Sequence, residues 1–431
     1  MPFLYLSALR RASCSGVTAL VLITAGAAPL AALDLTQSLR RALAADPRLA
    51  AGQFEIEAAR GGTLQAGMRP NPELSVELED FLGSGDYRGF EQAKLTISLS
   101  QKFERGDKRA ARVAVARGKE DVASAEIAVQ MREIVAQTKI DYIHVLGSQQ
   151  RLDLLVRSSK RFDDLIPLLR RRVEAGASPQ ADVSRGELAA GKARVAVEKA
   201  RTELVNAKRR LVANWSGTVS DAASVAGRLR HNGHRPAALQ ILLNGLDEHP
   251  AVRAWAAVLA QRQGELRLQG ATASPDLTAG IGVSRIFETD DTAVRLSGSI
   301  PLTVHDRNEG GIAEAQRRLA KVEHDREATR AQIRRRIIDA FGEFDAACVE
   351  AHQLLENVLP IARRAAEGVQ DSFNQGRLGV KDLLDAHRDQ YEADVQQLDA
   401  DIRCHAAAAK VEALAARSPF QHGWEAVTRR P

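Results

Sequence analysis

The second half of this chain repeats the plan of the first half, about 200 residues further on. An alternating stretch opens at Asn71–Leu74, and another opens at Pro275–Leu277. A glycine-containing turn at Gly176–Asp182 is echoed by the turn at Gly376–Asp382. Each half has the pattern of a helix, two short strands, one very long helix, a tight turn and a returning helix. An internal duplication of this kind fixes the architecture. It predicts a protein built around length rather than around a catalytic pocket.

Composition and charge exclude several classes of function. Aromatic residues make up only 4% of the chain, which is typical of long helices packed with small and branched side chains. The 60 Lys and Arg residues are interleaved with 55 Asp and Glu residues, and no basic stripe carries aromatic residues. We therefore expect no nucleic-acid partner. No nucleotide-binding, Ser-His-Asp or catalytic metal pattern occurs at a credible spacing, so we expect neither an enzyme nor a cofactor.

The first 32 residues have the pattern of a secretory signal peptide. Arg10 and Arg11 precede a short apolar run at Val17–Thr24, and small residues at 25–27 or at Ala32 offer cleavage sites. The apolar run is too short to span a bilayer as a stable helix. We therefore expect an exported mature chain without an obvious membrane anchor.

Two stretches of period-two alternation, 71–103 and 275–302, predict two β-hairpins. In the first, Leu74, Val76 and Leu78 alternate with polar residues before a glycine-rich turn. Each of the four strands is about as long as a tilted strand that crosses a bilayer, which needs ~9–11 residues. A small soluble sheet would alternate in the same way, so the strands alone leave both interpretations open.

Two segments, 106–175 and 310–375, keep helical spacing over an exceptional length. About 70 helical residues at 1.5 Å each would extend ~100 Å, whereas the mean helix in globular proteins has about 11 residues. Their apolar residues follow a coiled-coil-like seam. The predicted domains are the signal peptide 1–32, a first repeat 33–216 with return helix 179–215, a linker 217–236, a second repeat 237–416 with return helix 380–416, and a tail 417–431.

Four amphipathic strands cannot close a barrel, because a transmembrane barrel needs about eight or more and open edges are not tolerated in lipid. Three copies would supply twelve strands around a polar lumen. Glu77, Glu79, Thr96 and Ser98 have the parity of lumen-facing residues. The helices would then continue the tube through the periplasm. We therefore predict a mainly helical fold with a small β part, assembled as a trimeric 12-stranded outer-membrane barrel extended by a helical barrel.

Taken together, these stretches resemble the TolC-type outer-membrane efflux channels over nearly all of the mature sequence. The motifs that carry the resemblance are Arg69–Leu74, Leu99–Arg109, Ile300–Gly310 and Gly376–Ala386. Within that family, the Arg-Pro-Asn-Pro and Pro-Leu-x-x-x-Asp-Arg-Asn stretches resemble the branch that serves cobalt–zinc–cadmium and similar heavy-metal resistance pumps. One departure is Arg105-Gly106-Asp107, where the family pattern has Gly-Gly before Lys108.

The resemblance implies a passive homotrimeric channel in outer-membrane lipid, docked to a periplasmic adaptor and an inner-membrane RND-type pump. It implies that the turn residues form the adaptor-docking tips, although the same residues also suit plain helix capping. These residues are Gly176, Ser178, Asp182, Gly376, Arg377, Leu378, Gly379 and Asp382. The alternatives are a channel for drug efflux or type I protein secretion and, in a different class, a soluble periplasmic coiled-coil adaptor.

Two acidic residues, Glu367 and Asp371, lie in the last turns before the second tip. Threefold symmetry would gather three copies of each carboxylate, and such a ring favours cations. The sequence therefore offers them as a periplasmic gate. A solvated acidic helix face is the alternative interpretation of the same pattern.

Two cysteines, Cys348 and Cys404, lie 28 residues before and after Gly376, so a hairpin that turns there would place them at the same height. The periplasm permits a disulfide. Buried free thiols are a second interpretation. A metal site is a third, because His352 lies one turn from the first cysteine and His405 adjoins the second.

Overall fold

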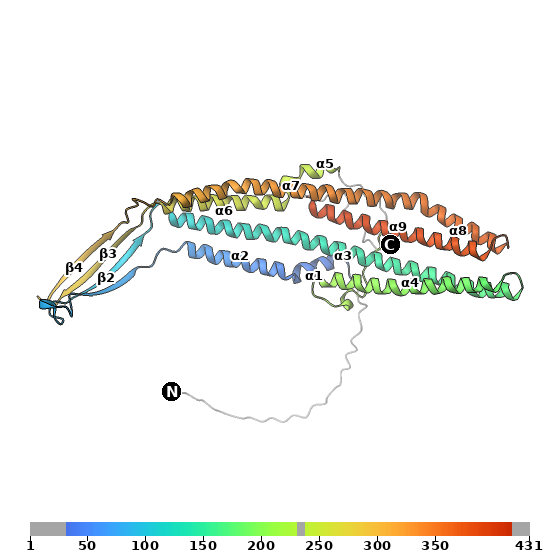
Figure 1. The fold of residues 1–431 in the computed structure, drawn as a ribbon, viewed down its shortest axis with the longest axis horizontal. Coiled ribbons are helices and arrows are strands. Elements are labelled where there is room, and N and C mark those ends of the chain that lie inside the picture. Colours follow the sequence, from blue (N-terminus) through green and yellow to red (C-terminus); the bar gives the residue numbers. More distant parts are fainter. Residues whose placement is uncertain (1–31, 231–237, 416–431) are drawn as a thin grey trace, which may run out of the picture.

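The computed structural model of the 431-residue chain describes residues 32–230 and 238–415. The described residues do not include residues 1–31 of the predicted signal peptide, residues 231–237 or the predicted tail. The molecule is elongated, with a sheet at one end and helices that run from it to two hairpin tips at the other end (Figure 1).

The helices repeat in the two halves of the chain. In the first half they are α1 (Leu35–Ala45), α2 (Pro47–Ala66), α3 (Lys108–Glu174) and α4 (Gln180–Ala213). In the second half they are α5 (Leu239–Asn244), α6 (Pro250–Thr272), α7 (Glu309–Gln353), α8 (Leu359–Asn374) and α9 (Val380–Leu414). None of the helices in residues 32–230 and 238–415 combines the length and the apolar character of a membrane-spanning helix.

The first helical region is broken where the spacing alone predicts one continuous helix. Asp46 caps α2 by accepting a hydrogen bond from the backbone N–H of Arg48 at 2.8 Å, and Pro47 takes the first helical position. The second half uses the same device, because His249 caps α6 by accepting from the N–H of Ala251 at 3.2 Å. The Asp-Pro pair in the sequence is the signal that would have located the break.

The strands form one antiparallel sheet in the order β1-β2-β3-β4. They are β1 (Glu73–Glu79), β2 (Lys94–Phe103), β3 (Leu277–Ile286) and β4 (Asp291–Ser299). The central pairing of β2 with β3 joins the two repeats, from Lys94 opposite Ile286 to Phe103 opposite Leu277. In the described part of the chain, β1 and β4 each keep one edge without a partner strand.

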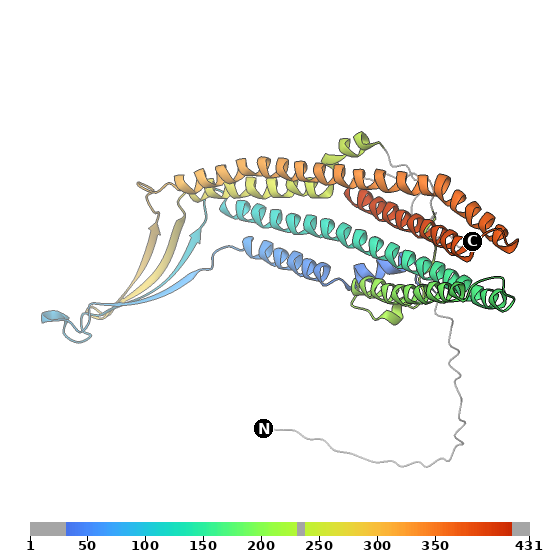
Figure 2. The ribbon, with the colours of Figure 1, turned by 45° about the vertical axis from the view of Figure 1, so that its right-hand side comes forward.

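The helices lie side by side in a curved wall (Figures 1 and 2). Helix α3 packs against α2 and α4 on one side and against α6 and α9 on the other, while α7 and α8 pack against α6 and α9. Helices α2 and α4 therefore form one edge of the wall, and α7 and α8 form the opposite edge. Buried Ala, Leu and Val side chains fill the interior, with Tyr142, Phe344 and Phe373 as the largest fully buried side chains.

The second long helix is interrupted, whereas the sequence predicts one helix over 310–375. A π-helical turn at Leu354–Val358 separates α7 from α8. The N–H of Leu359 donates to the carbonyl of Leu354, five residues earlier. Pro360 has no N–H to offer to the carbonyl four residues before it, which favours such a departure from α-helical bonding. Helix α3, in contrast, remains continuous through Pro167.

Candidate functional site

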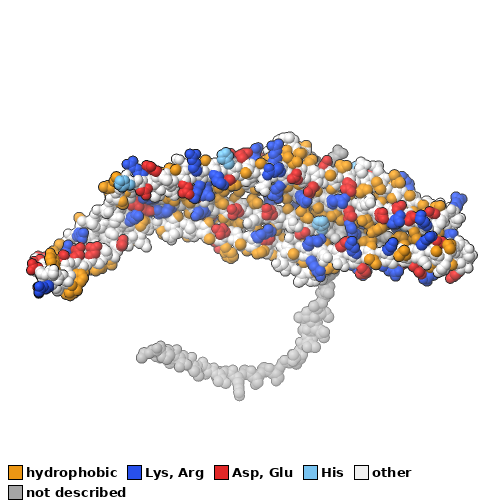
Figure 3. Space-filling view, viewed as in Figure 1, with side chains coloured by type: hydrophobic (Ala, Val, Ile, Leu, Met, Phe, Trp, Pro, Cys, Tyr) orange, Lys and Arg blue, Asp and Glu red, His pale blue; other side chains and the backbone are white. Residues whose placement is uncertain are grey.

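The sheet presents one strongly apolar face to its surroundings. The alternating residues on this face stay exposed in the protomer, and Leu296 and Val294 are 79% and 72% exposed. An apolar surface of this extent marks an interaction site. The face consists of Leu74, Val76, Leu78, Ile97, Leu99, Ile281, Val283, Val294 and Leu296. The helices differ, because acidic and basic side chains are mixed along their visible surface (Figure 3).

The opposite face of the sheet is polar and brings together the four residues predicted for the lumen. Glu77 pairs in register with Thr96, and Ser98 lies two residues further along β2. The Thr96 hydroxyl is buried, 2.9 Å from the Ser284 hydroxyl, while Glu77 and Glu79 remain exposed. The polar face therefore offers its carboxylates to solvent and keeps the threonine within the sheet.

Sequence reasoning missed two basic residues on the same polar face. Lys94 lies 3.6 Å from Glu79, and Arg295 lies 4.0 Å from Glu77 across the width of the sheet. The parity of β4 was the available signal, because Arg295 alternates with the apolar Val294 and Leu296. The polar face thus carries both charges rather than carboxylates alone.

An ion-pair cluster centred on half-buried Asp276 connects the sheet to the helices. Asp276, just before β3, lies 2.6 Å from the ammonium of Lys108 and 3.2 Å from that of Lys102, and it accepts from the N–H of Arg105 at 3.2 Å. Burial by itself would raise the pKa of Asp276, but these hydrogen bonds and charges lower it below its usual value. Asp107 takes φ of +59° at this junction, which explains why glycine is the expected residue there.

The first hairpin tip turns at Gly176, which takes φ of +69°. A serine followed by a proline is a pattern typical of a helix cap and a first helical residue, which would make Ser178 the cap and Pro179 the first residue of α4. In the structure Pro179 is itself the cap residue, and Ser178 makes no capping hydrogen bond. Asp182 is only 7% exposed and lies 3.3 Å from Arg185. Its side chain is therefore packed within the hairpin of the single protomer.

The second tip turns at Gly376, with φ of +72°. Asp382 accepts a hydrogen bond from the N–H of Gly379 at 3.1 Å and stays exposed. Arg377 is exposed and Leu378 is half-buried. Asp382 is therefore open to solvent at this tip, whereas the matching Asp182 of the first tip is buried.

The predicted gate residues, Glu367 and Asp371, lie one turn apart on α8 and are both exposed. Neither carboxylate has an ion-pair partner among residues 32–230 and 238–415. The pair is therefore free to face solvent or another subunit.

Cys348 and Cys404 form a disulfide that joins α7 to α9, with their Cα atoms 4.8 Å apart. This finding replaces the free-thiol and metal-site interpretations, because sulfurs bonded to each other are not thiolate ligands. His405 is buried, 3.0 Å through Nε2 from the carbonyl oxygen of Arg230, and His352 is exposed. Within the described ranges, no group of three or more His, Cys, Asp or Glu side chains is placed to hold a metal ion.

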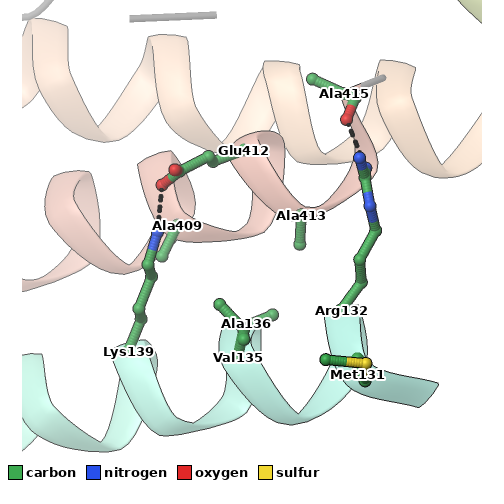
Figure 4. A pocket seen from close by; sticks show the side chains of 9 residues that line it. All are labelled: Met131, Arg132, Val135, Ala136, Lys139, Ala409, Glu412, Ala413 and Ala415. Atoms are coloured by element: carbon green, nitrogen blue, oxygen red, sulfur yellow. Dashed lines mark hydrogen bonds and ion pairs between the residues drawn. The ribbon is translucent and has the colours of Figure 1, made fainter. Parts of the chain in front are cut away.

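A small cavity of about 250 Å³ lies between α3 and α9 (Figure 4). An ion pair between Lys139 and Glu412 at 2.8 Å closes one end, and Arg132 donates to the carbonyl of Ala415 at 2.8 Å at the other end. Alanine side chains line most of the remainder. The cavity thus has the composition of a gap in helix packing.

Comparisons with known proteins agree with this architecture. The profile of the family described as "Outer membrane efflux protein" matches residues 38–217 and 243–417. The cobalt-zinc-cadmium resistance protein CzcC of Cupriavidus metallidurans is 28% identical, over 89% of this chain and 90% of its own length. The nickel-cobalt-cadmium resistance protein NccC of Alcaligenes xylosoxydans xylosoxydans is 24% identical, over 72% of this chain and 70% of its own.

Solved structures share the fold. A membrane protein from Pseudomonas aeruginosa superimposes with a TM-score of 0.73 at 18% identity, over 90% of this chain and 92% of that one. The outer membrane protein VceC of Vibrio cholerae gives a TM-score of 0.70 at 18% identity, over 89% of this chain and 96% of that one. Because the family profile matches both repeats, the chain belongs to the outer membrane efflux protein family, whose members are passive outer-membrane channels and not enzymes.

Proposed function

We propose that this chain is the outer-membrane channel of a tripartite efflux system that expels heavy-metal cations. The observation that carries the proposal is the similarity to CzcC along nearly the whole length of both chains. In this role the protein works as a homotrimer with a periplasmic adaptor and an inner-membrane RND-type pump. Because the family profile covers both repeats, a soluble periplasmic adaptor is no longer an alternative.

The unpaired edges of the sheet support assembly from three copies. Strands β1 and β4 leave open edges, which lipid does not tolerate. Three copies supply twelve strands, so the barrel closes when β4 of each copy pairs with β1 of the next. The apolar face then contacts lipid, and Glu77, Glu79, Thr96 and Ser98 belong to the face that lines the lumen. Because that face carries both charges, it lines a water-filled path for ions.

The two hairpin tips are the proposed contact with the adaptor. They lie at the end of the molecule farthest from the sheet (Figure 1). Of the predicted set, Gly176, Gly376, Arg377, Gly379 and Asp382 are exposed. Asp182 is buried in the protomer and pairs with Arg185 on its own helix.

Glu367 and Asp371 are the proposed periplasmic gate. Their exposure without ion-pair partners in the described part of the chain leaves them available to face the threefold axis. Rings of three carboxylates would favour cations. In planar bilayers, Glu367→Gln with Asp371→Asn is expected to lower the preference for cations over anions. Unchanged cation conductance would remove the gate from the proposal.

Complementation tests the function itself. The full-length chain is expressed in a Gram-negative host that has the adaptor and pump of a cobalt–zinc–cadmium system but lacks its outer-membrane component. We expect restored growth in zinc, cobalt and cadmium salts. A parallel host that lacks the channel of a drug-efflux or type I secretion system is the control. Restoration of drug efflux or secretion without metal resistance would overturn the metal assignment.

A further inference from the structure

A second, larger cavity lies between helices of both repeats. Its volume is about 450 Å³, and residues of α3, α7 and α9 and the residues at the start of α6 line it. Figures 1 and 2 show that α9 ends near the point where α6 begins, about midway along the wall. The apolar part of the lining includes Val129, Ile140, Ile333 and Leu414. Unlike the cavity of Figure 4, this one also contains a buried histidine.

That histidine, His249, presents an unused hydrogen-bond donor to the cavity. It is only 6% exposed and belongs to the lining. Its Nδ1 accepts from the backbone N–H of Ala251 at 3.2 Å, so the neutral ring carries its proton on Nε2. Nε2 has no hydrogen-bond partner among residues 32–230 and 238–415. A buried donor without a partner costs free energy, and an acceptor in the cavity would remove that cost.

The same position of the proton makes a metal ion an unsuitable occupant. A histidine binds a metal through a nitrogen that has a lone pair, and Nε2 of His249 carries the proton instead. Moving that proton to Nδ1 would break the hydrogen bond that caps α6. The described part of the chain also places no three His, Cys, Asp or Glu side chains together for a metal. The donor therefore requires a hydrogen-bond acceptor.

The charges that act on His249 are positive. Burial lowers the pKa of His249 most, and the charges of Arg132 and Arg336 lower it further. Both arginines line the cavity. Arg132 donates to the carbonyl oxygen of Ala415, whereas Arg336 has neither an ion-pair nor a hydrogen-bond partner in the described ranges. An acceptor beside His249 is therefore favoured when it carries negative charge.

Three carboxylates line the cavity as well, and they restrict what the ligand can be. Glu343 pairs with Lys410 at 2.6 Å, while Glu133 and Asp339 are exposed to solvent. None of the three contributes to the pKa shift of His249. Because they would repel a second anionic group, the ligand carries its negative charge at one end only. The apolar lining favours an uncharged remainder.

We propose that this cavity binds a small organic anion, a monocarboxylate with an apolar body. One carboxylate oxygen accepts a hydrogen bond from Nε2 of His249, and the guanidinium of Arg336 neutralises the charge together with Arg132. The apolar body contacts Val129, Ile333 and the other apolar lining residues. The site requires only the folded protomer, so it is independent of the trimer and of the metal substrate in the proposed function.

Calorimetric titration of the detergent-purified, full-length protein with hexanoate tests the site. For so small a ligand we expect a dissociation constant on the order of 1 mM. Hexanol and hexylammonium have the same apolar chain without the negative charge, and we expect neither to bind at that concentration. Hexanol that binds as tightly as hexanoate would overturn the proposal, because the cavity would then select only an apolar body.

Three variants test the assigned groups. His249→Asn keeps a side chain that can cap α6 but removes the Nε2 donor, and we expect roughly tenfold weaker hexanoate binding. Arg336→Gln removes an exposed charge, so roughly threefold weaker binding is expected. Arg335→Gln is the matched control, because that exposed arginine is adjacent on α7 but does not line the cavity. Partitioning of hexanoate into micelles is the same for all variants. Equal affinity of the parent, His249→Asn and Arg336→Gln would refute the site.

The carboxylate can come from a free molecule or from Glu425, in the predicted tail that follows α9. The full-length variant Glu425→Gln separates the two sources. Tighter hexanoate binding by this variant than by the parent would assign the site to the carboxylate of the tail, and equal binding would assign it to a free molecule. Absence of hexanoate binding to both proteins would overturn the proposal.

Discussion

Asp46 and His249 occupy equivalent places in the two repeats, and each caps the N-terminus of a helix, one with a carboxylate and the other with an imidazole. Each precedes a proline at the first position of a helix and accepts a hydrogen bond from a backbone N–H two residues further on. A carboxylate can do this throughout the physiological pH range. An imidazole accepts through Nδ1 only while that nitrogen carries no proton. The second repeat is therefore expected to depend on pH at a position where the first does not.

Burial, followed by the charges of Arg132 and Arg336, lowers the pKa of His249 to about 4. An unfolded histidine titrates near 6.5. Between these values the unfolded state binds more protons, so stability falls as the pH falls from about 6.5 to about 4. Thermal unfolding of the parent protein should show a steeper loss over this window than His249→Asn, which keeps a capping side chain. Identical pH profiles for the two proteins would show that His249 does not contribute.

At the scale of elements, the periodicity of the sequence predicted the strands and the long helices, because many residues contribute to each of these patterns. The alternation of β1 to β4 and the long apolar seams were readable because they recur over many residues. The break at Asp46-Pro47 and the π-helical turn at Leu354–Val358 depend on single backbone groups, which an average over a window does not register. The cysteine pair was placed at equal height by its distances from Gly376, but spacing alone left thiol, disulfide and metal open.

The Cys348–Cys404 disulfide closes a loop across a sequence separation of 56 residues, which contains α8, the second tip and part of α9. Constraining such a loop in the unfolded chain stabilises the folded state by about 4 kcal/mol in the chain-entropy description. The double variant Cys348→Ala, Cys404→Ala is therefore expected to unfold at lower denaturant concentration. Reduced parent protein should match it. Alkylation of both cysteines in the native, unreduced protein would show that the bond is absent.

At the scale of the whole molecule, the duplicated plan and the family were predictable from the sequence, because length and repetition leave few architectures. The contacts that join the repeats were not. Asp276 pairs with Lys108 across more than 160 residues of sequence, and no local sequence pattern predicts that partner. Arg295 reaches Glu77 only because β2 and β3 lie between them in one sheet. Such contacts follow from the topology, and the topology must be known first.

The two faces of β4 provide a sharp test of how the sheet sits in lipid. Leu296 belongs to the apolar face, and its neighbour Ser297 belongs to the polar face, where it lies against Gly280. An arginine on a lipid-facing strand costs about 2–4 kcal/mol near the bilayer midplane, whereas the lumen tolerates charge. Leu296→Arg is therefore expected to reduce the amount of assembled trimer in the outer-membrane fraction severalfold. Ser297→Arg should assemble at the parent level and change only the ion preference in planar bilayers. Equal assembly of both variants would contradict the placement of the apolar face in lipid.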